Sequence, residues 1–582
     1  MSNDRLIPAN GTPSVVTTLI RVNGTEIPRT YGVLTLVVSK EVNRIPNAKI
    51  ILKDGEPSQE DFPLSNDELF TLGNEIEVLV GYEAKEDVLF KGIIVKQRIK
   101  ITANGSSLLQ LDCRDELFKT TLTPRNRYFS EVKDSEAFEE IIGEYGLDLS
   151  VDQTETAHQE LVQYEQTDWQ FIVSRAELSG LLCLVDDGSL SIKKPDFDQE
   201  PVFPLIYGAS ILEFDGEIDA RQQYANVVAS SWDFSGQEVL EAEALEPKLK
   251  EAGNLKATDL ARVGGELPLV LRHSGQVAQD ELQNWADAQL LKMRMKKLQG
   301  RVKFHGSPDV KLGALVTLQG LGDRFNGPVF VSGVRHEVQG GTWQTDVQFG
   351  LADDWFKNSL GDTSKKTKLF QNTTGLQIGV VTQLQDDPDS ENRILVKSPI
   401  IDNASDGVWA RVSTLDAGEN RGTFFMPEIG DEVVMGFVNG DQRDPVVLGM
   451  LHSSTKTAPL ESSDDNFEKG YISKSGIKLL FDDDKKSLNI ETPAGKKIVL
   501  DEDGGFLGLE DENNNKIIMD SNGIVIESGG KLELKSTQDL KLEGGINLEL
   551  KAGASFKAEG TAGAELSTSA VAVLKGSLVQ IN

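Results

Sequence analysis

The side chains that could carry chemistry in this chain are few and scattered. Metal binding or acid–base catalysis would draw on its five histidines, His158, His273, His305, His336 and His452. No two of them stand at a zinc-ligand spacing, and none falls in the last 130 residues. The sequence therefore predicts no metal, no cofactor and no enzyme activity.

An acidic run, Asp482-Asp483-Asp484, is the other candidate, because carboxylate oxygens are the ligands that calcium prefers. The run lacks the calcium-loop pattern with a bidentate Glu downstream, so a solvated turn is the better interpretation. No glycine-rich phosphate loop or nucleophile elbow occurs. The chain holds 92 Asp and Glu residues, so two neighbouring carboxylates would be no sign of catalysis.

Charge and cysteine content exclude further classes of function. The formal net charge of −33 argues against nucleic acid or an anionic membrane as the main partner. Cys113 and Cys183 lie in apolar stretches and are predicted to be buried thiols, so nothing indicates an oxidising compartment. The first residues lack a signal-peptide core, and no apolar run reaches about 18 residues. We therefore expect synthesis in the cytoplasm without a signal peptide.

The strongest pattern is an eight-residue repeat that is strict over 524–579. Positions one and three are apolar and would point the same way along a strand, while positions five and six are small and suit a corner. The repeat predicts a needle core made of Ile524, Ile526, Leu532, Leu534, Leu540, Leu542, Leu548, Leu550, Phe556, Leu566 and Leu574.

The number of octads decides between two architectures. Three octads would make one triangular coil, so the seven octads of a lone chain complete only about two coils and bury little. Three intertwined chains would supply about 21 strands and a prism about 35 Å long, with no open edges. The sequence favours the trimer over the alternative, a single-chain solenoid docked on a partner.

Charges alternate in sign from octad to octad at the outward positions. Position two reads Glu533, Lys541, Glu549, Lys557 and Glu565, and position four begins Glu527, Lys535, Glu543. A solvated face explains this adequately. A ladder that fixes the register between strands is the sharper hypothesis, because opposite charges on neighbouring strands stabilise and like charges destabilise.

The last two octads lose most of their charge. A blunt apolar end on a rigid prism would aggregate unless it were covered. We hypothesise a tip that binds a separate cap protein; ordinary fraying or self-covering of the terminus is the alternative. The predicted tip consists of Leu578, Val579, Gln580, Ile581 and Asn582.

Upstream of the repeat, short strands bounded by Gly, Asn or Asp alternate with three helices. The helices are predicted at about 135–145, from a Thr167 cap to Gly180, and at about 277–298. Five strands between Gly379 and Leu451 are typical of a small Greek-key barrel. The resulting domains are 1–355, a polar linker 356–375, a barrel domain 376–454, a second linker 455–470, and a needle 471–582 whose segments recur loosely before the strict octads.

Several motifs resemble those of a known family. The stretches GVVTQLQDDPDSENRILVKSP, VWARVST, FMPEIGDEV and GDQRDPVVLGMLH resemble the OB-fold domain of VgrG spike proteins. The stretches LGNEIEVLVGY, LFKGIIV, QTDWQF and VDDGSLSIKKP resemble the phage hub protein that is fused in front of it. The linker 455–470 leaves no room for the lysozyme domain of some phage needles, and we expect a spike without a toxin domain after the repeat.

The resemblance implies a fold that is mainly β with some α: hub-like β-barrel domains with helical insertions, an OB-fold barrel, and a C-terminal triple-stranded intertwined β-helix in a homotrimer. It implies a puncturing spike of a contractile injection machine, extracellular or cell-anchored, that pierces a target membrane mechanically. The implied partners are the chain itself, inner-tube and baseplate proteins, a PAAR-type tip cap and effector cargo, with no nucleic acid. The alternative is a trimeric adhesin or tail fibre, and a third class, a polysaccharide-cutting β-helix enzyme, would need longer coils.

Overall fold

A computed structural model describes residues 15–103, 106–351, 375–401 and 407–581. They fall into two compact units, residues 1–452 and 453–582, which are described separately below. Apart from Gly375, the predicted linker 356–375 lies outside the described residues.

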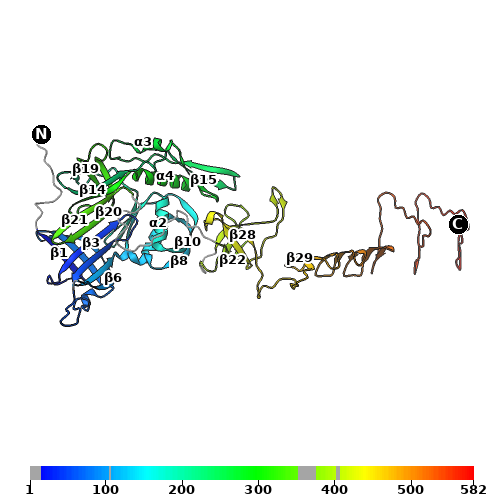
Figure 1. The fold of residues 1–582 in the computed structure, drawn as a ribbon. Coiled ribbons are helices and arrows are strands. Elements are labelled where there is room, and N and C mark those ends of the chain that lie inside the picture. The colour runs from blue at the N-terminus through cyan, green and yellow to red at the C-terminus, as the bar shows by residue number, and fades with distance from the viewer. Residues whose placement is uncertain (1–14, 104–105, 352–374, 402–406, 582) are drawn as a thin grey trace. The chain divides into compact units, whose positions relative to one another are not determined.

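The first unit is built on a 13-stranded, mostly antiparallel sheet (Figure 1). One half holds β1 (Val16–Val22), β2 (Thr25–Glu26), β3 (Val33–Glu41), β4 (Asn47–Lys53), β5 (Glu75–Tyr82), β6 (Lys85–Ile101) and β7 (Ser107–Arg114). The other holds β13 (Pro204–Ile206), β14 (Ile211–Ile218), β18 (Leu298–His305), β19 (Leu315–Gln319), β20 (Gly327–Gln339) and β21 (Thr342–Phe349). Antiparallel pairing of β20 with β3 joins the halves, and each half packs its own apolar cluster.

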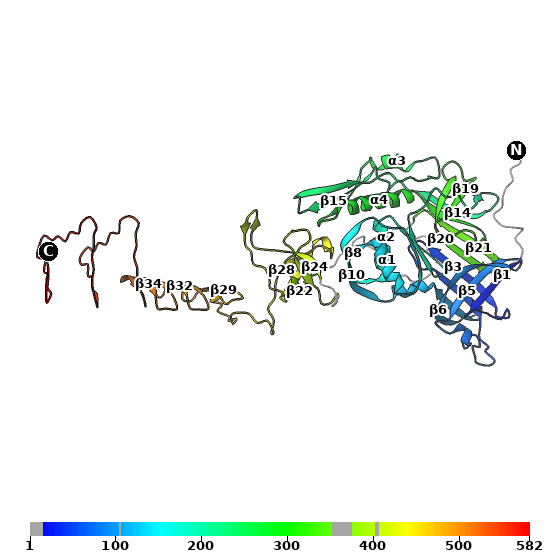
Figure 2. The ribbon, with the colours of Figure 1, turned by 180° about the vertical axis from the view of Figure 1, so that it is seen from behind.

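Two insertions carry the helices. The first contains β8 (Pro124–Lys133), α1 (Asp134–Gly143), β9 (Asp148–Val151), β10 (Ala157–Thr167), α2 (Asp168–Leu178), β11 (Leu182–Asp186) and β12 (Ser189–Lys193). The second contains β15 (Val227–Asp233), β16 (Glu238–Glu243), α3 (Ala257–Leu260), β17 (Leu269–His273) and α4 (Gln279–Met295). Figure 2, the view from behind, shows α1, α2 and α4 in the same region of the first unit. Helix α4 packs on β15 and β16 through Leu282, Trp285 and Leu290.

The start of α2 shows how local sequence sets these boundaries. The Thr167 hydroxyl accepts a hydrogen bond from the Gln170 amide at 3.2 Å, and the Gln170 side chain accepts one from the Thr167 amide at 3.0 Å. This is the predicted capping box, in which two otherwise unpaired amides are satisfied reciprocally. Gly180 follows the helix with a φ of 68°, a left-handed backbone conformation that residues with a Cβ rarely adopt.

The barrel predicted after the linker closes on itself. Its strands are β22 (Gln377–Gln383), β23 (Ile394–Lys397), β24 (Val408–Val412), β27 (Glu432–Phe437) and β28 (Pro445–Met450), in the order β22-β23-β24-β28-β27. Inward residues such as Val381, Val396 and Val447 form its core. Between β24 and β27, a small hairpin of β25 (Ala417–Gly418) and β26 (Arg421–Gly422) leaves the barrel.

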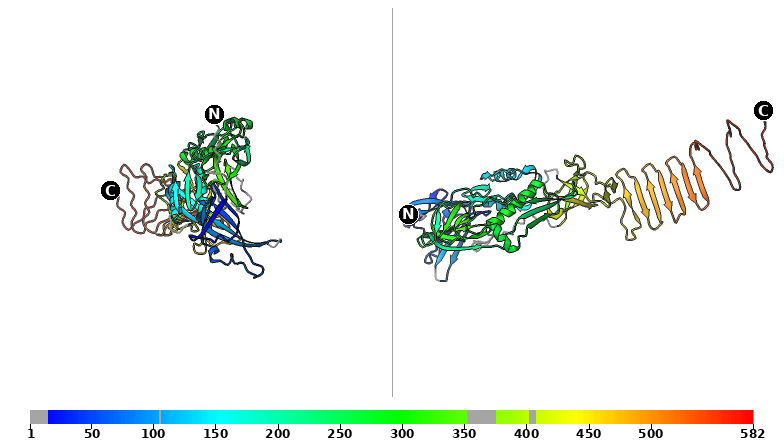
Figure 3. Two further views of the ribbon diagram at one scale, coloured as in Figure 1. Left: turned by 90° about the vertical axis from the view of Figure 1, so that its left-hand side faces the viewer. Right: turned by 90° about the horizontal axis from the view of Figure 1, so that it is seen from above.

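The second unit begins with a seven-stranded antiparallel meander, drawn in yellow to orange on the right of Figure 3. Its strands, each of five residues, are β29 (Glu468–Ile472), β30 (Lys478–Asp482), β31 (Ser487–Glu491), β32 (Lys497–Asp501), β33 (Phe506–Glu510), β34 (Lys516–Asp520) and β35 (Gly523–Glu527). Each strand pairs with the next along the chain. None of the helices among the described residues has the length and apolar character needed to span a bilayer.

Candidate functional site

The predicted needle residues are exposed in the single chain. Leu532, Leu534, Leu540, Leu542, Leu548 and Leu550 are 56–61 % accessible, a nearly constant value that reflects one conformation repeated octad by octad. After β35 the structure has no strand pairing between 528 and 581. The apolar positions thus lack any partner within the described part of their own chain, and burying them requires another molecule.

Bends recur every eight residues, as the repeat predicted. They fall at 529–530, 537–538, 545–546, 553–554, 561–562, 569–570 and 577–578. These are positions six and seven of the octad, so the predicted corner at positions five and six was placed one residue too early. Gly529 remains inside the corner, where an added Cβ would lie 2.4 Å from the Asn513 carbonyl oxygen.

The meander carries the apolar pattern upstream of the octads. Cross-strand pairing aligns one row of side chains through Tyr471, Leu479, Ile490, Ile498, Leu509, Ile517 and Ile526. A second row on the same face runs through Phe481, Leu488, Leu500, Leu507, Met519 and Ile524. Leu479, Ile498 and Leu509 remain 36–40 % exposed, because no second layer covers this face.

Alternating charges line one border of the meander. Lys478, Glu491, Lys497, Glu510, Lys516 and Glu527 stand opposite one another in order, so every neighbour has the opposite sign. Glu491 lies 4.0 Å from Lys478 and 3.7 Å from Lys497. In the octads the pairs form within a repeat instead, as between Lys541 and Glu543 at 2.5 Å. The predicted register ladder between octads stays a prediction, since it concerns neighbouring chains.

The predicted tip is also exposed. Leu578 and Ile581 are 82 % and 88 % accessible, whereas Val579 is 46 % accessible. Asn582 lies outside the described residues. The tip therefore presents two large apolar side chains that nothing in the described chain covers.

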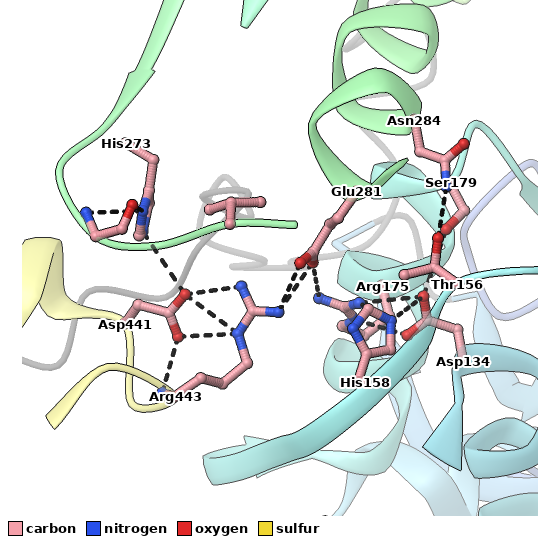
Figure 4. A network of polar contacts seen from close by, with 12 residues as sticks. Asp134, Thr156, His158, Arg175, Ser179, His273, Glu281, Asn284, Asp441 and Arg443 are labelled. Atoms are coloured by element: carbon pink, nitrogen blue, oxygen red, sulfur yellow. Dashed lines mark hydrogen bonds and ion pairs between the residues drawn. The ribbon is translucent and has the colours of Figure 1, made fainter. Parts of the chain in front are cut away.

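A site that the sequence did not predict joins the barrel to the hub-like region of the first unit (Figure 4). Glu281, at the start of α4, accepts hydrogen bonds from Arg443 of the barrel at 2.9 and 3.0 Å and lies 3.3 Å from Arg175 of α2. Arg175 donates to Asp134 at 2.7 Å and to His158 Nε2 at 2.9 Å. One buried carboxylate is thus shared by two arginines from different parts of the fold.

The barrel end of this network is closed by Asp441. Arg443 donates to the Asp441 carboxylate at 2.8 Å, and His273 Nε2 lies 3.6 Å from the same carboxylate. Burial alone would raise the pKa of Asp441, but the Arg443 guanidinium outweighs it and lowers that pKa to about 2. The pKa of Glu281 is also lowered: burial opposes its ionisation, but the charges of Arg443 and Arg175 outweigh burial and hold the pKa below the usual value. These carboxylates therefore stay charged, and breaking one pair would leave a buried charge uncompensated.

Other contacts support the same junction. Gln159 of β10 donates to Asp389 of the barrel at 2.9 Å, and Asn126 donates to the Ile400 carbonyl at 3.2 Å. The Arg411 guanidinium lies 4.4 Å from the ring centroid of Phe234, in the turn between β15 and β16. The barrel is therefore held by three separate segments rather than by one flexible hinge.

Both cysteines and His336 are buried in the interior of the first unit. Cys113 and Cys183 are fully buried, as predicted, and burial raises the pKa of both thiols. His336 is buried, and burial lowers the pKa of its imidazole to about 3. Within the described ranges, no group of three His, Cys, Asp or Glu residues is placed to hold a metal ion.

Two known families match most of the first unit. The family described as the Alg8 N-terminal domain matches residues 12–340, which is more than half of the chain. The family described as the type VI secretion system/phage-baseplate injector OB domain matches residues 377–452, the closed barrel and its last strand.

Individual relatives match the barrel region in sequence. The spike protein VgrG1a of Pseudomonas aeruginosa is 34 % identical over 73 residues, 12 % of this chain and 11 % of that protein. VgrG3 of Vibrio cholerae is 37 % identical over 57 residues, 10 % of this chain and 6 % of that protein. The matched stretch therefore spans about a tenth or less of these relatives.

Solved structures share the fold over a longer stretch. A chain of the lidded Francisella PdpA–VgrG complex aligns with 88 % of this chain and 80 % of its own length, with a TM-score of 0.51 and 8 % identity. The lidless form aligns with 88 % of this chain and 98 % of its own length, with the same TM-score and identity.

Proposed function

This chain belongs to the family defined by the Alg8 N-terminal domain and is of the VgrG spike type, and from that premise we propose a homotrimeric puncturing spike at the tip of a contractile injection machine. The hub-like region would sit on an inner tube and baseplate, and the barrel would join it to a needle. The role is mechanical rather than enzymatic. Work would be done by a sheath, and this chain would transmit force through a shape that does not buckle.

The observation that carries this proposal is the exposure of the needle core. Leu542 is 57 % accessible, and the octads around it form no strand pairing within the chain. Two further copies wound on the same axis would pair the extended segments and bury both apolar positions of each octad. A trimeric β-prism of this kind is rigid, because every strand is hydrogen-bonded on both sides.

The junction supports force transmission from hub to needle. Arg443 connects the barrel to Glu281 through charge-assisted hydrogen bonds that are shielded from solvent. Shifting the barrel relative to the hub-like region would have to break this network together with the Gln159–Asp389 and Arg411–Phe234 contacts. A spike needs such a joint, whereas an adhesin that only binds a surface does not.

The partners follow from the two ends of the chain. Inner-tube and baseplate proteins are the partners proposed for the hub-like region, and a PAAR-type cap for the apolar tip around Leu578 and Ile581. Effector cargo would travel on the same particle. The assembled particle would deliver the chain to the target envelope.

The mass of the full chain in solution tests the stoichiometry. Light scattering or native mass spectrometry should give three times the chain mass of 63.6 kDa. A stable single-chain mass at micromolar concentration would contradict the intertwined needle.

The tip and the injection role need a second measurement. Deleting residues 578–582 should leave the trimer mass unchanged and weaken capture of a purified cap protein. Trimers that never associate with tube or baseplate proteins would favour the adhesin alternative instead.

A further inference from the structure

A cationic surface lies on the hub-like region of a chain that is otherwise strongly acidic. Three neighbouring strands of the large sheet, β4, β7 and β6, carry it, and they are drawn in shades of blue in Figure 1. The cationic face, as we call this surface, consists of Lys49, Lys53, Lys96, Arg98 and Lys100. The whole chain holds 92 Asp and Glu residues against 59 Lys and Arg residues, so this face reverses the average charge.

Strand geometry explains why these side chains point outward. On β4, Ile50 lies in the apolar cluster of this half of the sheet, so the alternate residues Lys49 and Lys53 face the other way. On β6, Ile94 lies in the same cluster, and the pairing with β7 shifts by one residue between Ile94 and Lys96. Because of this irregularity, Lys96 and the alternate positions after it point away from the core instead of into it.

Cross-strand pairing arranges the cations in two columns. The rows across β4, β7 and β6 read Lys53–Leu108–Lys100, Ile51–Gln110–Arg98 and Lys49–Asp112–Lys96. Neighbouring strands are about 4.8 Å apart, so the columns on β4 and β6 lie about 10 Å from each other. The outward side of β7 therefore forms a strip with a single carboxylate between two cationic columns.

The chain leaves most of this charge uncompensated. The Lys96 ammonium lies 3.8 Å from the Asp112 carboxylate, and the Lys96 side chain is 64 % exposed. The other members of the cationic face form no ion pair with any residue that the structure describes. Like charges at this separation repel one another, so an anionic molecule laid over β7 would relieve the repulsion and contact both columns.

We propose that the cationic face binds an extended acidic segment of another protein, whose chain runs along β7. Side chains of an extended segment repeat their direction about every 6.8 Å, which is also the spacing of successive outward side chains on β4 and β6. Acidic side chains at alternate positions would therefore reach both columns.

The composition of the face favours a protein over a nucleic acid. Its centre holds the aliphatic side chains of Ile51 and Leu108 and the amide of Gln110. None of the described outward residues of the three strands is aromatic, so nucleobases would find no ring to stack on. The net charge of −33 would also repel a polyanion more strongly than a short acidic segment.

Fluorescence anisotropy with the full chain and a labelled peptide of alternating Glu and Ser tests the face. Lys96→Glu combined with Arg98→Glu and Lys100→Glu reverses one column and should weaken binding at least about tenfold at about 50 mM salt. These three side chains are exposed, so the variant should keep the unfolding midpoint of the unmodified protein.

The matched control changes the net charge by the same amount elsewhere. It combines Lys85→Glu, Lys248→Glu and Lys256→Glu, at exposed lysines outside the cationic face, and should weaken binding less than about twofold. Equal weakening in the two triple variants would overturn the proposal, because long-range charge would then explain the binding. An oligothymidylate of equal charge that binds more tightly than the peptide would overturn it in favour of a nucleic acid.

Carbodiimide cross-linking locates the bound peptide independently, since it joins a Glu carboxylate to a lysine amine as an amide. Peptide adducts at the four lysines of the cationic face should exceed those at Lys85 and Lys248 about fivefold. Adducts spread evenly over the exposed lysines would overturn the proposal, as would links from the face to carboxylates of a second copy. The face lies within one chain, so none of these outcomes decides the spike proposal, which the solution mass tests.

Discussion

The two units of this molecule use the same β-pattern with opposite results. In the first unit, Val78, Phe304 and Phe349 are completely buried by neighbours from the same chain. In the second, Leu479 and Leu542 occupy equally apolar positions yet remain 38 % and 57 % exposed. The sequence periodicity is not what differs, because both regions alternate apolar and polar side chains along their strands.

Closure and layering explain the contrast. Strands of the first unit reach 17 residues, fold over one another, and are backed by helices such as α2 and α4. The barrel closes with five strands around its own core. The meander strands have five residues each and remain one flat layer, which cannot cover its own apolar face. One chain thus buries the core of the first unit, whereas the second unit leaves its apolar face uncovered in the single chain, as the proposed trimer requires.

Leu542→Asp should have the largest effect of all the substitutions, because it changes the apolar face that the second unit leaves exposed in the single chain. In the proposed trimer this carboxylate would be buried without a partner, so the expected result is loss of assembly, with the solution mass falling from three chains to one. The first unit should keep its circular dichroism and its unfolding midpoint.

The control places the same side chain one residue away. Lys541→Asp lies at an outward position beside Glu543, and should leave the mass at three chains. If Leu542→Asp also assembles with unchanged mass, the inward assignment of octad position three is wrong.

The corresponding core substitution in the first unit is Phe304→Ala. Phe304 is fully buried against Phe203 and Val302, and its truncation should cost about 3–5 kcal/mol by leaving a cavity. Calorimetry should show a lower midpoint for the first unit and an unchanged transition for the needle. Phe304→Leu, which keeps most of the volume, should shift the same midpoint much less. Equal shifts in both transitions would mean that the units do not fold independently.

Local sequence patterns predicted several features of the fold. The Thr167–Gln170 capping box and the Gly180 stop follow from contacts within a few residues. The octads could be recognised because any needle repeat must preserve its period. The corner was misplaced by one residue because small side chains at positions five and six permit the bend without fixing its centre.

The junction could not be predicted in the same way. Glu281 and Arg443 are 162 residues apart, and Arg175 lies 106 residues before Glu281. Charged side chains are usually exposed to solvent, and no local sequence pattern indicates that these three are buried. Asp441 and Arg443 stand in the motif that pointed to the OB fold, but their pairing with α4 depends on how the barrel docks.

Acid titration can test the first unit separately, because the polar network between the barrel and the hub-like region lies entirely within that unit. The pKa of Asp441 in the folded state, about 2, lies below its ordinary value, so its ionisation stabilises the fold above about pH 4. That contribution, about 2 kcal/mol, is lost as the pH falls toward 2. Asp441→Asn should therefore flatten the acid-induced fall in the midpoint of the first unit.

Asp444 provides a control of opposite sign. Burial, followed by the nearby Asp441 charge, raises the pKa of Asp444, so protonation of Asp444 favours the fold as the pH falls. Asp444→Asn removes that gain and should steepen the acid loss. His273 and Arg443 face Asp441, whereas His273 and Arg411 act on Asp444, and all three are unchanged in both variants. Identical acid profiles for the two variants would exclude the junction as the titrating element.

The smallest expected effect concerns the charge ladder of the needle. Glu491 stands between Lys478 and Lys497 on neighbouring strands, so Glu491→Lys would place three like charges in a row. Because all three side chains are partly exposed, the cost should be about 0.5 kcal/mol, seen as a slightly lower needle midpoint. Combining it with Lys478→Glu restores one of the two opposite-charge pairs and should recover part of the midpoint. High salt should abolish the difference, since it screens exposed charges. A loss that persists in high salt would instead mean that Glu491 packs against a neighbouring chain, which would move this border of the meander from the solvent to the trimer interface.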